Sequence, residues 1–164
     1  MVKYDFLFKS LLERRICPLI IRFIWNLYCN AQYCIKWNCK STLPFSVSNG
    51  VKQGGVTSAF LFTVVVDALI VSVKNLKTGC YIGRICACIF VYADDVILLA
   101  PSRNAAQNML NECKRFNRKS GMKFNTDKCK YIIFGDIPEV IENLRIGDVE
   151  LELVPSIKHI GHVI

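Results

Sequence analysis

The sequence predicts an α+β fold in which helices pack against antiparallel strands. Four segments carry apolar residues at the three- and four-residue steps of a helix, and two others resemble hairpins, with apolar strands on either side of a turn. The chain has 164 residues, 52% of them hydrophobic, including ten Phe, six Tyr and two Trp. This is the length of one domain at most, with enough apolar surface to exclude intrinsic disorder.

The first half of the chain is predicted to hold three helices and a hairpin. Tyr4–Glu13 has one apolar side, and residues 18–30 begin with a proline, which suits the first turn of a helix. Residues 32–47 alternate apolar and polar side chains, as strands do. Turn residues at Asn49-Gly50 precede Ser58–Lys74, which we expect to form a long helix buried on most sides.

The second half is predicted to combine a hairpin, one more helix and shorter strands. Arg103–Ser120 has the pattern of an amphipathic helix, with Ser102 or Asn104 able to cap its start and Gly121 placed to end it. Further strands are expected at residues 131–134 and 157–164.

Hydropathy indicates exposed apolar surface but disfavours a membrane span. The mean hydropathy of +0.32 is high for a short domain, which points to surface that contacts lipid, a partner or missing chain. Residues 53–73 are long enough to cross a bilayer, yet Asp67 lies inside the segment and two glycines open it, so a buried helix is favoured. Charged residues interrupt the N-terminus before a signal sequence develops. We expect an intracellular protein of the nucleus or cytoplasm, neither secreted nor membrane-bound.

The nine cysteines are predicted to be reduced residues of a hydrophobic core. None has the C-x-x-C spacing of a zinc knuckle, and most have apolar neighbours, which disfavours a disulfide framework. His159 and His162 could ligate a metal together with a cysteine, but packing or exposure to solvent is the favoured interpretation.

The net charge of +8 is unevenly distributed. Residues 1–40 carry seven basic and two acidic residues, and residues 101–130 carry eight and two. Residues 131–164 carry two basic and six acidic residues. The two basic segments suit a polyanionic partner such as nucleic acid, and an ordinary solvated helix face is the alternative.

The turn at Tyr92-Ala93-Asp94-Asp95 concentrates potential chemistry. Two apolar runs, residues 85–92 and 96–99, are separated only by Ala93-Asp94-Asp95, so we expect a hairpin with two carboxylates at its tip. In most proteins two adjacent aspartates in a turn have only a structural role, because Asp favours turn conformations. Here the apolar arms force the tip outward, where it could hold Mg²⁺, an ion that takes few protein carboxylates and completes its shell with water and substrate phosphates.

A glycine-rich segment, residues 49–58, forms a second constellation. Its glycines permit close approach of a nucleotide, the following helix offers free amides to an anion, and Gln53 and Ser58 add hydrogen bonds. The segment lacks the Walker spacing and the dinucleotide fingerprint, so taken alone an ordinary loop is favoured.

In this order, the two constellations resemble the palm of reverse transcriptases, most closely those of non-LTR retrotransposons. Residues 50–58 (Gly-Val-Lys-Gln-Gly-Gly-Val-Thr-Ser) followed by Leu61-Phe62 are similar to sequence motif B, and Tyr92-Ala93-Asp94-Asp95 to motif C. Residues 121–130 resemble motif D, and residues 157–164 resemble motif E, the primer grip. One small departure is Ala59, where the family usually has proline.

The resemblance implies RNA-templated DNA synthesis by a magnesium- or manganese-dependent enzyme. Asp94 and Asp95 would be the metal-binding carboxylates, and Lys128 a general acid near the departing pyrophosphate, although an ordinary solvated lysine is the competing interpretation. The implied partners are an RNA template, a DNA primer and deoxynucleoside triphosphates. The remaining implied site residues would contact nucleotide, template or primer: Gln53, Gly54, Gly55, Ser58, Tyr92, Ile160 and Gly161.

The resemblance also implies a reverse transcriptase domain truncated at both ends. Residues 1–50 would connect fingers and palm, and residues 51–164 would form the palm with motifs B to E. The family's first catalytic aspartate lies on a strand before the first helix, and Asp5 aligns inside that helix, so it is not assigned the role. We expect the first palm strand, most of the fingers and the thumb to be missing. The alternative function is therefore an inactive remnant that at most binds nucleic acid.

Overall fold

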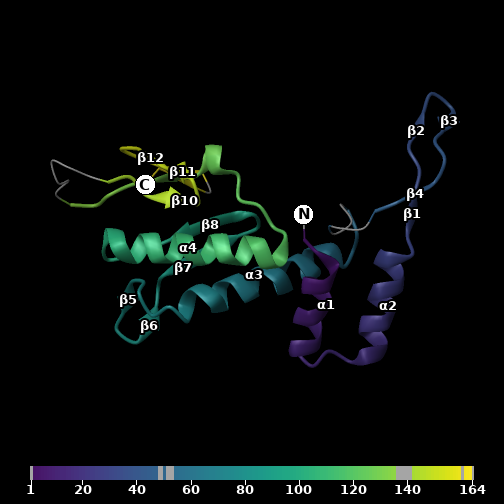
Figure 1. The fold of residues 1–164 in the computed structure, drawn as a ribbon, viewed down its shortest axis with the longest axis horizontal. Helices are drawn as coiled ribbons and strands as arrows, with labels where there is room; N and C mark the ends of the chain where they lie inside the picture. The colour runs from purple at the N-terminus through teal and green to yellow at the C-terminus, as the bar shows by residue number, and fades with distance from the viewer. Residues whose placement is uncertain (1, 48–49, 51–53, 136–141, 160, 164) are drawn as a thin grey trace. The chain divides into compact units, whose positions relative to one another are not determined.

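The structure of the chain is a computed structural model that describes residues 2–47, 50, 54–135, 142–159 and 161–163. It divides into two compact units. The N-terminal unit comprises Met1–Leu69 and Arg118–Met122, and the C-terminal unit comprises Ile70–Asn117 and Lys123–Ile164. The boundaries fall inside α3 (Ser58–Lys74) and near the end of α4 (Arg103–Ser120), both drawn in Figure 1.

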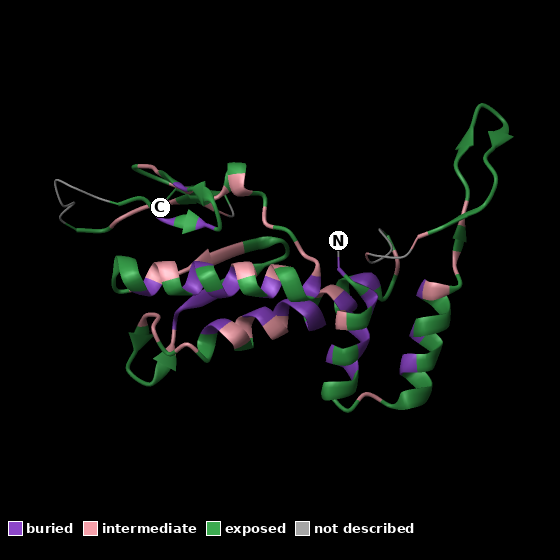
Figure 2. Ribbon diagram, viewed as in Figure 1, coloured by how far each residue is buried: buried purple, intermediate pink, exposed green. Residues whose placement is uncertain are grey.

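The helices α1 (Tyr4–Glu13) and α2 (Pro18–Cys29) form a helical hairpin in the N-terminal unit, as their apolar spacing predicts. Aromatic rings fill the space between them. The Tyr4 ring lies edge-on to Tyr28 with centroids 6.0 Å apart, and Phe8 and Trp25 approach to 4.8 Å. Figure 2 shows buried residues along both helices. They include Leu7, Leu11, Ile21 and Ile24.

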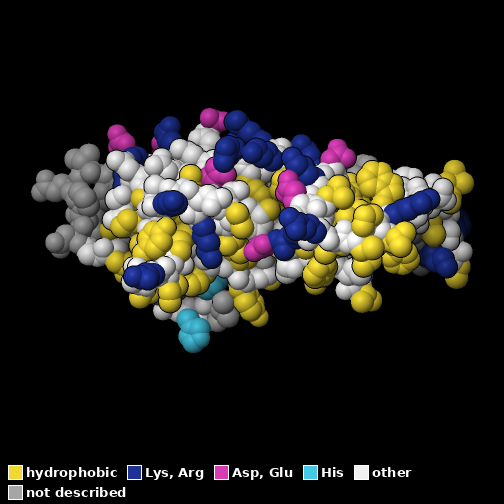
Figure 3. Space-filling view, turned by 90° about the horizontal axis from the view of Figure 1, so that it is seen from below, with side chains coloured by type: hydrophobic (Ala, Val, Ile, Leu, Met, Phe, Trp, Pro, Cys, Tyr) yellow, Lys and Arg dark blue, Asp and Glu magenta, His cyan; other side chains and the backbone are white. Residues whose placement is uncertain are grey.

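The outer side of α2 remains apolar and exposed. Leu19 is 74% exposed and Phe23 62%. Figure 3 shows hydrophobic side chains gathered over the α1–α2 hairpin. The exposed apolar surface that the high mean hydropathy predicts is therefore present on this helix.

A narrow β-ribbon follows α2 and confirms the hairpin predicted at residues 32–47. β1 (Gln32–Tyr33) pairs with β4 (Phe45–Ser46), and β2 (Lys36–Trp37) pairs with β3 (Lys40–Ser41), both antiparallel. The tip turns at Asn38 and Cys39, whose φ angles of 44° and 62° lie in the left-handed region. Positive φ at both central residues is the requirement of a type I′ hairpin turn.

The predicted long helix is α3. Leu61, Val65 and Leu69 are fully buried along one stripe at four-residue spacing, whereas Phe60 and Val71 are exposed. Burial is thus less complete than the sequence predicts, because the apolar residues encircle the helix while packing covers part of it. Arg14, directly after α1, forms an ion pair with Asp67 of α3. Within the described residues, no helix has both the length and the apolarity needed to span a bilayer.

In the C-terminal unit, α4 packs on short strands through a small core. Leu110 on α4 is clustered with Leu144, Ile146 and Leu151, and Leu98, Ala106, Cys129 and Tyr131 surround the cluster. β10 (Arg145–Ile146) pairs with β11 (Val149–Glu150) across a turn in which Gly147 has a φ of 65°. Ser102 caps α4, since its hydroxyl accepts a hydrogen bond from the Ala105 amide at 3.3 Å, as one of the two predicted caps.

Two consecutive hairpins share backbone hydrogen bonds. β5 (Tyr81–Ile82) pairs with β6 (Ile85–Cys86), and β7 (Ile89–Tyr92) pairs with β8 (Asp95–Leu98). The Cys80 amide, before β5, donates to the Leu99 carbonyl, after β8, at 3.2 Å. Within the separate hairpins, the Ala87 amide donates to the Cys80 carbonyl at 2.9 Å and the Leu99 amide to the Cys88 carbonyl at 2.8 Å. The apolar run predicted as one arm, residues 85–92, is therefore divided between two hairpins, because the chain bends at Cys88.

Two strand predictions near the C-terminus are wrong in extent. The strand expected at residues 131–134 is β9 (Lys130–Tyr131), which pairs in parallel with β12 (Glu152–Leu153). The single strand expected at residues 157–164 is a hairpin of β13 (Lys158–His159) and β14 (His162–Val163). Gly161 has a φ of 81°, which allows the chain to reverse inside the segment predicted as one strand.

The fold class is mixed helix and small β-sheets, mostly antiparallel, in agreement with the α+β prediction. Across the part of the chain that the structure describes, the strands form separate two-stranded ladders, of which β9–β12 is parallel. The finer expectation, that residues 51–164 form a polymerase palm with an antiparallel sheet, stays a prediction.

Candidate active site

The β7–β8 hairpin carries the predicted carboxylates. Tyr92 pairs with Asp95 and Ile89 with Leu98, so a two-residue loop, Ala93-Asp94, joins the strands. Alternation places Ile89 and Leu98 on one face, where Ile89 is buried and Leu98 packs against the α4 core. Tyr92 and Asp95 occupy the opposite, exposed face. One face thus anchors the hairpin while the other presents functional groups.

The turn itself is tightly constrained. Ala93 has a φ of 51°, in the region that disfavours residues with a Cβ. A positive φ at the first loop residue is what a two-residue hairpin requires. This conformation keeps Asp94 in the loop and Asp95 at the start of β8, so two adjacent carboxylates lie at the exposed tip.

The chemistry of these two carboxylates fits a hard divalent cation. Within residues 54–135 and the other described ranges, neither Asp94 nor Asp95 has an ion pair or a side-chain hydrogen bond. The same residues contain no cluster of three or more His, Cys, Asp or Glu side chains able to hold a metal. Carboxylate oxygens are nevertheless the ligand type of Mg²⁺, which binds few carboxylates and fills its remaining positions with water and phosphate oxygens.

The glycine-rich segment lies in the N-terminal unit. Gly54 is exposed with a φ of 75°, and no atom lies within 4 Å of the position that a Cβ would take there. The Gly55 carbonyl accepts a hydrogen bond from the Ser58 amide at 3.0 Å, at the start of α3. Open space beside a glycine is what close approach of a ligand requires. Gln53, predicted to contact the nucleotide, lies outside the described residues.

Ser58 holds the start of α3 in place. It is buried, and its Oγ lies 3.1 Å from the Tyr28 hydroxyl on α2. The hydroxyl predicted to line the nucleotide site thus has a protein partner in this structure.

Lys128 follows α4 on a single 3₁₀ turn, Thr126–Lys128. The Asn125 side chain accepts a hydrogen bond from the Asp127 amide at 3.2 Å and fixes this turn. Lys128 is exposed, and no ion pair engages it among the described residues. A solvated cation of this kind is available to an anionic ligand.

The predicted primer grip lies on the β13–β14 hairpin. Gly161 is exposed at its turn, while Ile160 lies outside the described residues. His159 and His162 are cross-strand partners in the same hairpin; His159 is half-buried and His162 is exposed.

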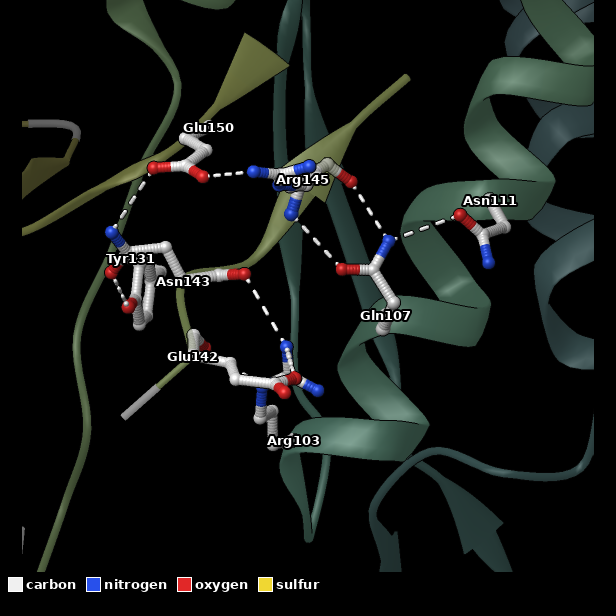
Figure 4. Close-up of polar contacts among 8 residues, drawn as sticks. All are labelled: Arg103, Gln107, Asn111, Tyr131, Glu142, Asn143, Arg145 and Glu150. Atoms are coloured by element: carbon white, nitrogen blue, oxygen red, sulfur yellow. Dashed lines mark hydrogen bonds and ion pairs between the residues drawn. The ribbon is translucent and has the colours of Figure 1, made fainter. Parts of the chain in front are cut away.

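A polar network that sequence reasoning did not identify joins α4 to the β10–β11 hairpin (Figure 4). The Gln107 side-chain amide donates to the Arg145 carbonyl, and its oxygen accepts from the Arg145 amide, each at 2.9 Å. Arg103 donates to the Glu142 carbonyl at 2.7 Å and forms an ion pair with the Glu142 carboxylate. These groups line an open cleft of about 660 Å³. The sequence feature that could have indicated this network is the four-residue spacing of Arg103, Gln107 and Asn111, which places them on one side of α4.

The network continues to β11. Arg145 forms an ion pair with Glu150, and Asn143 donates to the same carboxylate at 3.4 Å. These hydrogen bonds, that of Arg145 first, lower the pKa of Glu150. Tyr131 donates its hydroxyl to Asn143 at 3.1 Å. Each of these side chains has a partner within the network. The clearest role of the network is therefore to hold the β10–β11 hairpin against α4.

Comparison with known proteins identifies the class of this chain. The profile of the family described as "Reverse transcriptase (RNA-dependent DNA polymerase)" matches residues 1–164. The chain therefore belongs to the reverse transcriptase family, and the family predicted from motifs B to E is confirmed.

Its relatives include Pol polyproteins of retrotransposable elements. It is 29% identical over 109 residues to the polyprotein of the type-2 element R2DM of Drosophila melanogaster, covering 66% of this chain and 10% of that protein. Identity is 30% over 111 residues with the polyprotein of the type-1 element R2 of Popillia japonica, covering 67% and 18%. The transposon TX1 uncharacterized 149 kDa protein of Xenopus laevis is 23% identical over 139 residues, covering 83% and 11%. The chain thus spans less than one fifth of each relative's length.

Proposed function

We propose that this chain is part of the RNA-directed DNA polymerase of a non-LTR retroelement, with Asp94 and Asp95 as its metal-binding carboxylates. The observation that carries the proposal is the β7–β8 hairpin, which holds both side chains exposed on a constrained turn. The family match across residues 1–164 and the retrotransposon relatives support the assignment.

In the proposed reaction, the primer 3′-oxygen attacks the α-phosphorus of a deoxynucleoside triphosphate opposite an RNA template. The bond from the α-phosphorus to its bridging oxygen breaks, and pyrophosphate leaves. Asp94 and Asp95 would hold Mg²⁺ or Mn²⁺, which supplies charge neutralisation for the phosphates and a more acidic primer hydroxyl. In this proposal the two carboxylates bind and orient the metal ion, and the buried face of the hairpin keeps the carboxylates in position.

The other proposed roles follow the positions of the side chains. Tyr92, 63% exposed on the same face as Asp95, would flank the primer end. Gly54 and Gly55, with Gln53 and Ser58, would line nucleotide and template. The exposed Lys128 would give a proton to the departing pyrophosphate or neutralise its charge.

The proposed domain organisation assigns residues 1–50 to the connection between fingers and palm, and residues 51–164 to the palm. Ile160 and Gly161 would support the primer terminus. A polymerase of this kind would act inside the cell on nucleic acid and nucleotides, without a membrane partner.

Binding of Mn²⁺, followed by electron paramagnetic resonance, tests the proposed metal site without requiring turnover. The variants Asp94→Asn and Asp95→Asn should each weaken binding by about tenfold or more, because each removes a charged ligand. Asp148→Asn is a matched control, since Asp148 also lies exposed in a hairpin turn, between β10 and β11. Equal binding by wild type, Asp94→Asn and Asp148→Asn would contradict the assignment.

A second candidate function, nucleic-acid binding without catalysis, is favoured by the tip of the β-ribbon. Trp37 is 77% exposed and pairs across the strands with Lys40, with Lys36 beside it. An exposed aromatic ring beside a cross-strand lysine suits a stacked base and its phosphate. In this second candidate function, residues 1–164 alone would bind nucleic acid and polymerise little or not at all.

Primer extension on an RNA template with Mg²⁺ separates the two functions. We expect no extension by residues 1–164, and binding of single-stranded RNA that weakens steeply with salt as phosphate contacts release counterions. Trp37→Ala should weaken binding, while Trp25→Phe, a change inside the α1–α2 packing, should not. Robust extension that disappears in Asp94→Ala would instead establish that this chain is a complete catalyst.

A further inference from the structure

Two cysteines lie side by side beneath the β7–β8 hairpin. The Sγ atoms of Cys86 and Cys88 are 3.0 Å apart, and both residues are free thiols. Alternate residues of an extended chain point to the same side, and the bend at Cys88 brings the two side chains closer than a regular strand would. A shift of about 1 Å separates this contact from the 2.05 Å length of a disulfide bond.

The two thiols have different environments, and this difference gives them different chemical roles. Cys86 is half-buried, and the hydrogen bond with Cys88 lowers the pKa of its thiol, with further help from the Tyr81 hydroxyl and the Lys74 ammonium. Cys88 is 1% exposed, and burial raises the pKa of its thiol to about 11. An accessible thiolate attacks external disulfides, whereas a buried thiol reacts with a neighbour that it already touches.

Gly79 completes the packing around Cys88. A Cβ placed on Gly79 would lie 2.0 Å from the Cys88 Cβ, so the absent side chain is what admits Cys88 to this position. Close packing against the Gly79 backbone therefore leaves the Cys88 side chain little room to move.

We propose that Cys86 and Cys88 form a redox-sensitive dithiol site that a low-molecular-weight disulfide, such as oxidised glutathione, converts into an intramolecular disulfide. The Cys86 thiolate attacks one glutathione sulfur, forming a mixed disulfide and releasing one glutathione thiolate. Cys88 loses its proton to water, its sulfur attacks Cys86 Sγ, and the second glutathione leaves. The two cysteine sulfurs lose two electrons in total, and the glutathione disulfide gains them.

This site lies at the root of the hairpin that carries Asp94 and Asp95. The Cys88 carbonyl accepts the 2.8 Å hydrogen bond from the Leu99 amide, immediately below the Ile89 and Leu98 pair. Drawing the Cys88 side chain toward Cys86 displaces the residue that makes this bond. Oxidation is therefore expected to speed hydrogen exchange of the Leu99 amide, and reduction to restore it.

Peptide mapping of the native chain tests the proposal directly. After incubation with oxidised glutathione and alkylation of the remaining thiols, trypsin should release residues 85–103, which contain Cys86 and Cys88 and no other cysteine. We expect this peptide to be unalkylated and lighter by two hydrogen atoms. Recovery of the same peptide with two alkylated thiols, while the exposed Cys17 and Cys34 carry glutathione, would overturn the proposal.

Variants separate the two steps. Cys88→Ser should trap glutathione on Cys86, and Cys86→Ser should leave Cys88 unmodified, because its buried sulfur lacks an attacking partner. Cys80→Ser is the matched control, since Cys80 belongs to the same pair of hairpins and lies outside the 3.0 Å sulfur contact; it should oxidise like wild type. A disulfide from Cys80 to either residue, or a disulfide between two chains, would also overturn the assignment. Because the mapping of the native chain needs no substitution, poor folding of a variant leaves the proposal testable.

Discussion

The hydroxyl of Tyr28, in the last turn of α2, lies 3.1 Å from the hydroxyl of Ser58, in the first turn of α3, and both residues are buried. This contact fixes the N-terminus of α3 directly after the glycine-rich segment. Each hydroxyl satisfies the other in a place where water does not reach, so loss of one partner leaves the other unpaired.

Tyr28→Phe should therefore destabilise the chain by about 1–2 kcal/mol, the cost of a buried unpaired hydroxyl, although it retains the aromatic packing against Tyr4. Urea unfolding measures this change. Tyr92→Phe removes a hydroxyl from an exposed ring and should change stability by less than about 0.5 kcal/mol. Equal effects of the two substitutions would contradict the role of the buried contact.

Ala93→Gly should preserve or raise stability, by up to about 1 kcal/mol, because glycine adopts the observed φ of 51° without a Cβ clash. Ala93→Val should lower it. Thermal unfolding of both variants tests the turn geometry, with Ala106→Gly as the control. Ala106 lies inside α4, where glycine should cost about 1 kcal/mol. A loss in Ala93→Gly as large as that in Ala106→Gly would be inconsistent with a left-handed Ala93.

Leu144→Ala should destabilise the C-terminal unit by about 2–5 kcal/mol, because it empties part of the small core beneath α4. The same substitution at Leu43, which is 88% exposed, should cost less than about 0.5 kcal/mol. Urea unfolding, with hydrogen exchange of the α4 amides, measures both. A small effect at Leu144 would show that α4 is held mainly by its polar contacts.

Glu150→Gln should lower stability near neutral pH and have less effect in acid. The Arg145 hydrogen bond lowers the folded-state pKa of Glu150 below its unfolded value of about 4.3. The stabilisation is therefore present above that unfolded value and is lost as pH falls through the lowered folded-state pKa. Urea unfolding at about pH 7 and about pH 3 compares the two regimes.

Glu13→Gln is the control for the acid experiment. The Glu13 carboxylate lies 3.9 Å from the Lys9 ammonium, and both side chains are largely exposed. Such a pair contributes little, so this substitution should change stability little at either pH. A difference between wild type and Glu150→Gln that grows on acidification would contradict the sign of the linkage.

The helices could be predicted closely from the sequence, because period and capping are local signals. Three helices have the predicted bounds: Tyr4–Glu13, Ser58–Lys74 and Arg103–Ser120. The Ser102 cap is also a local feature, because its hydroxyl lies three positions before the amide that donates to it. The β7–β8 hairpin was predictable for a related reason, since its arms are separated by a short polar turn.

The C-terminal strands were less predictable because their geometry depends on distant or ambiguous features. Residues 157–164 mix apolar and basic residues around a single glycine, and only the φ of Gly161 distinguishes a reversal from a straight strand. The pairing of Gln107 with Arg145 joins residues 38 positions apart. The positions of Asp94 and Asp95 at a hairpin tip were predictable from local pattern; their roles, and those of Lys128 and Ser58, remain predictions.

The pairing of Tyr92 with Asp95 has a consequence for how this region tolerates insertions and deletions. In a hairpin with a two-residue loop, adding or removing one residue between the strands shifts the pairing and inverts one arm. Ile89 or Leu98 would then exchange faces with its neighbour. The shifted arm would no longer pack its apolar side chain against the core, and Asp95 would turn toward α4. Among related chains, this turn should therefore vary by substitution and keep its length.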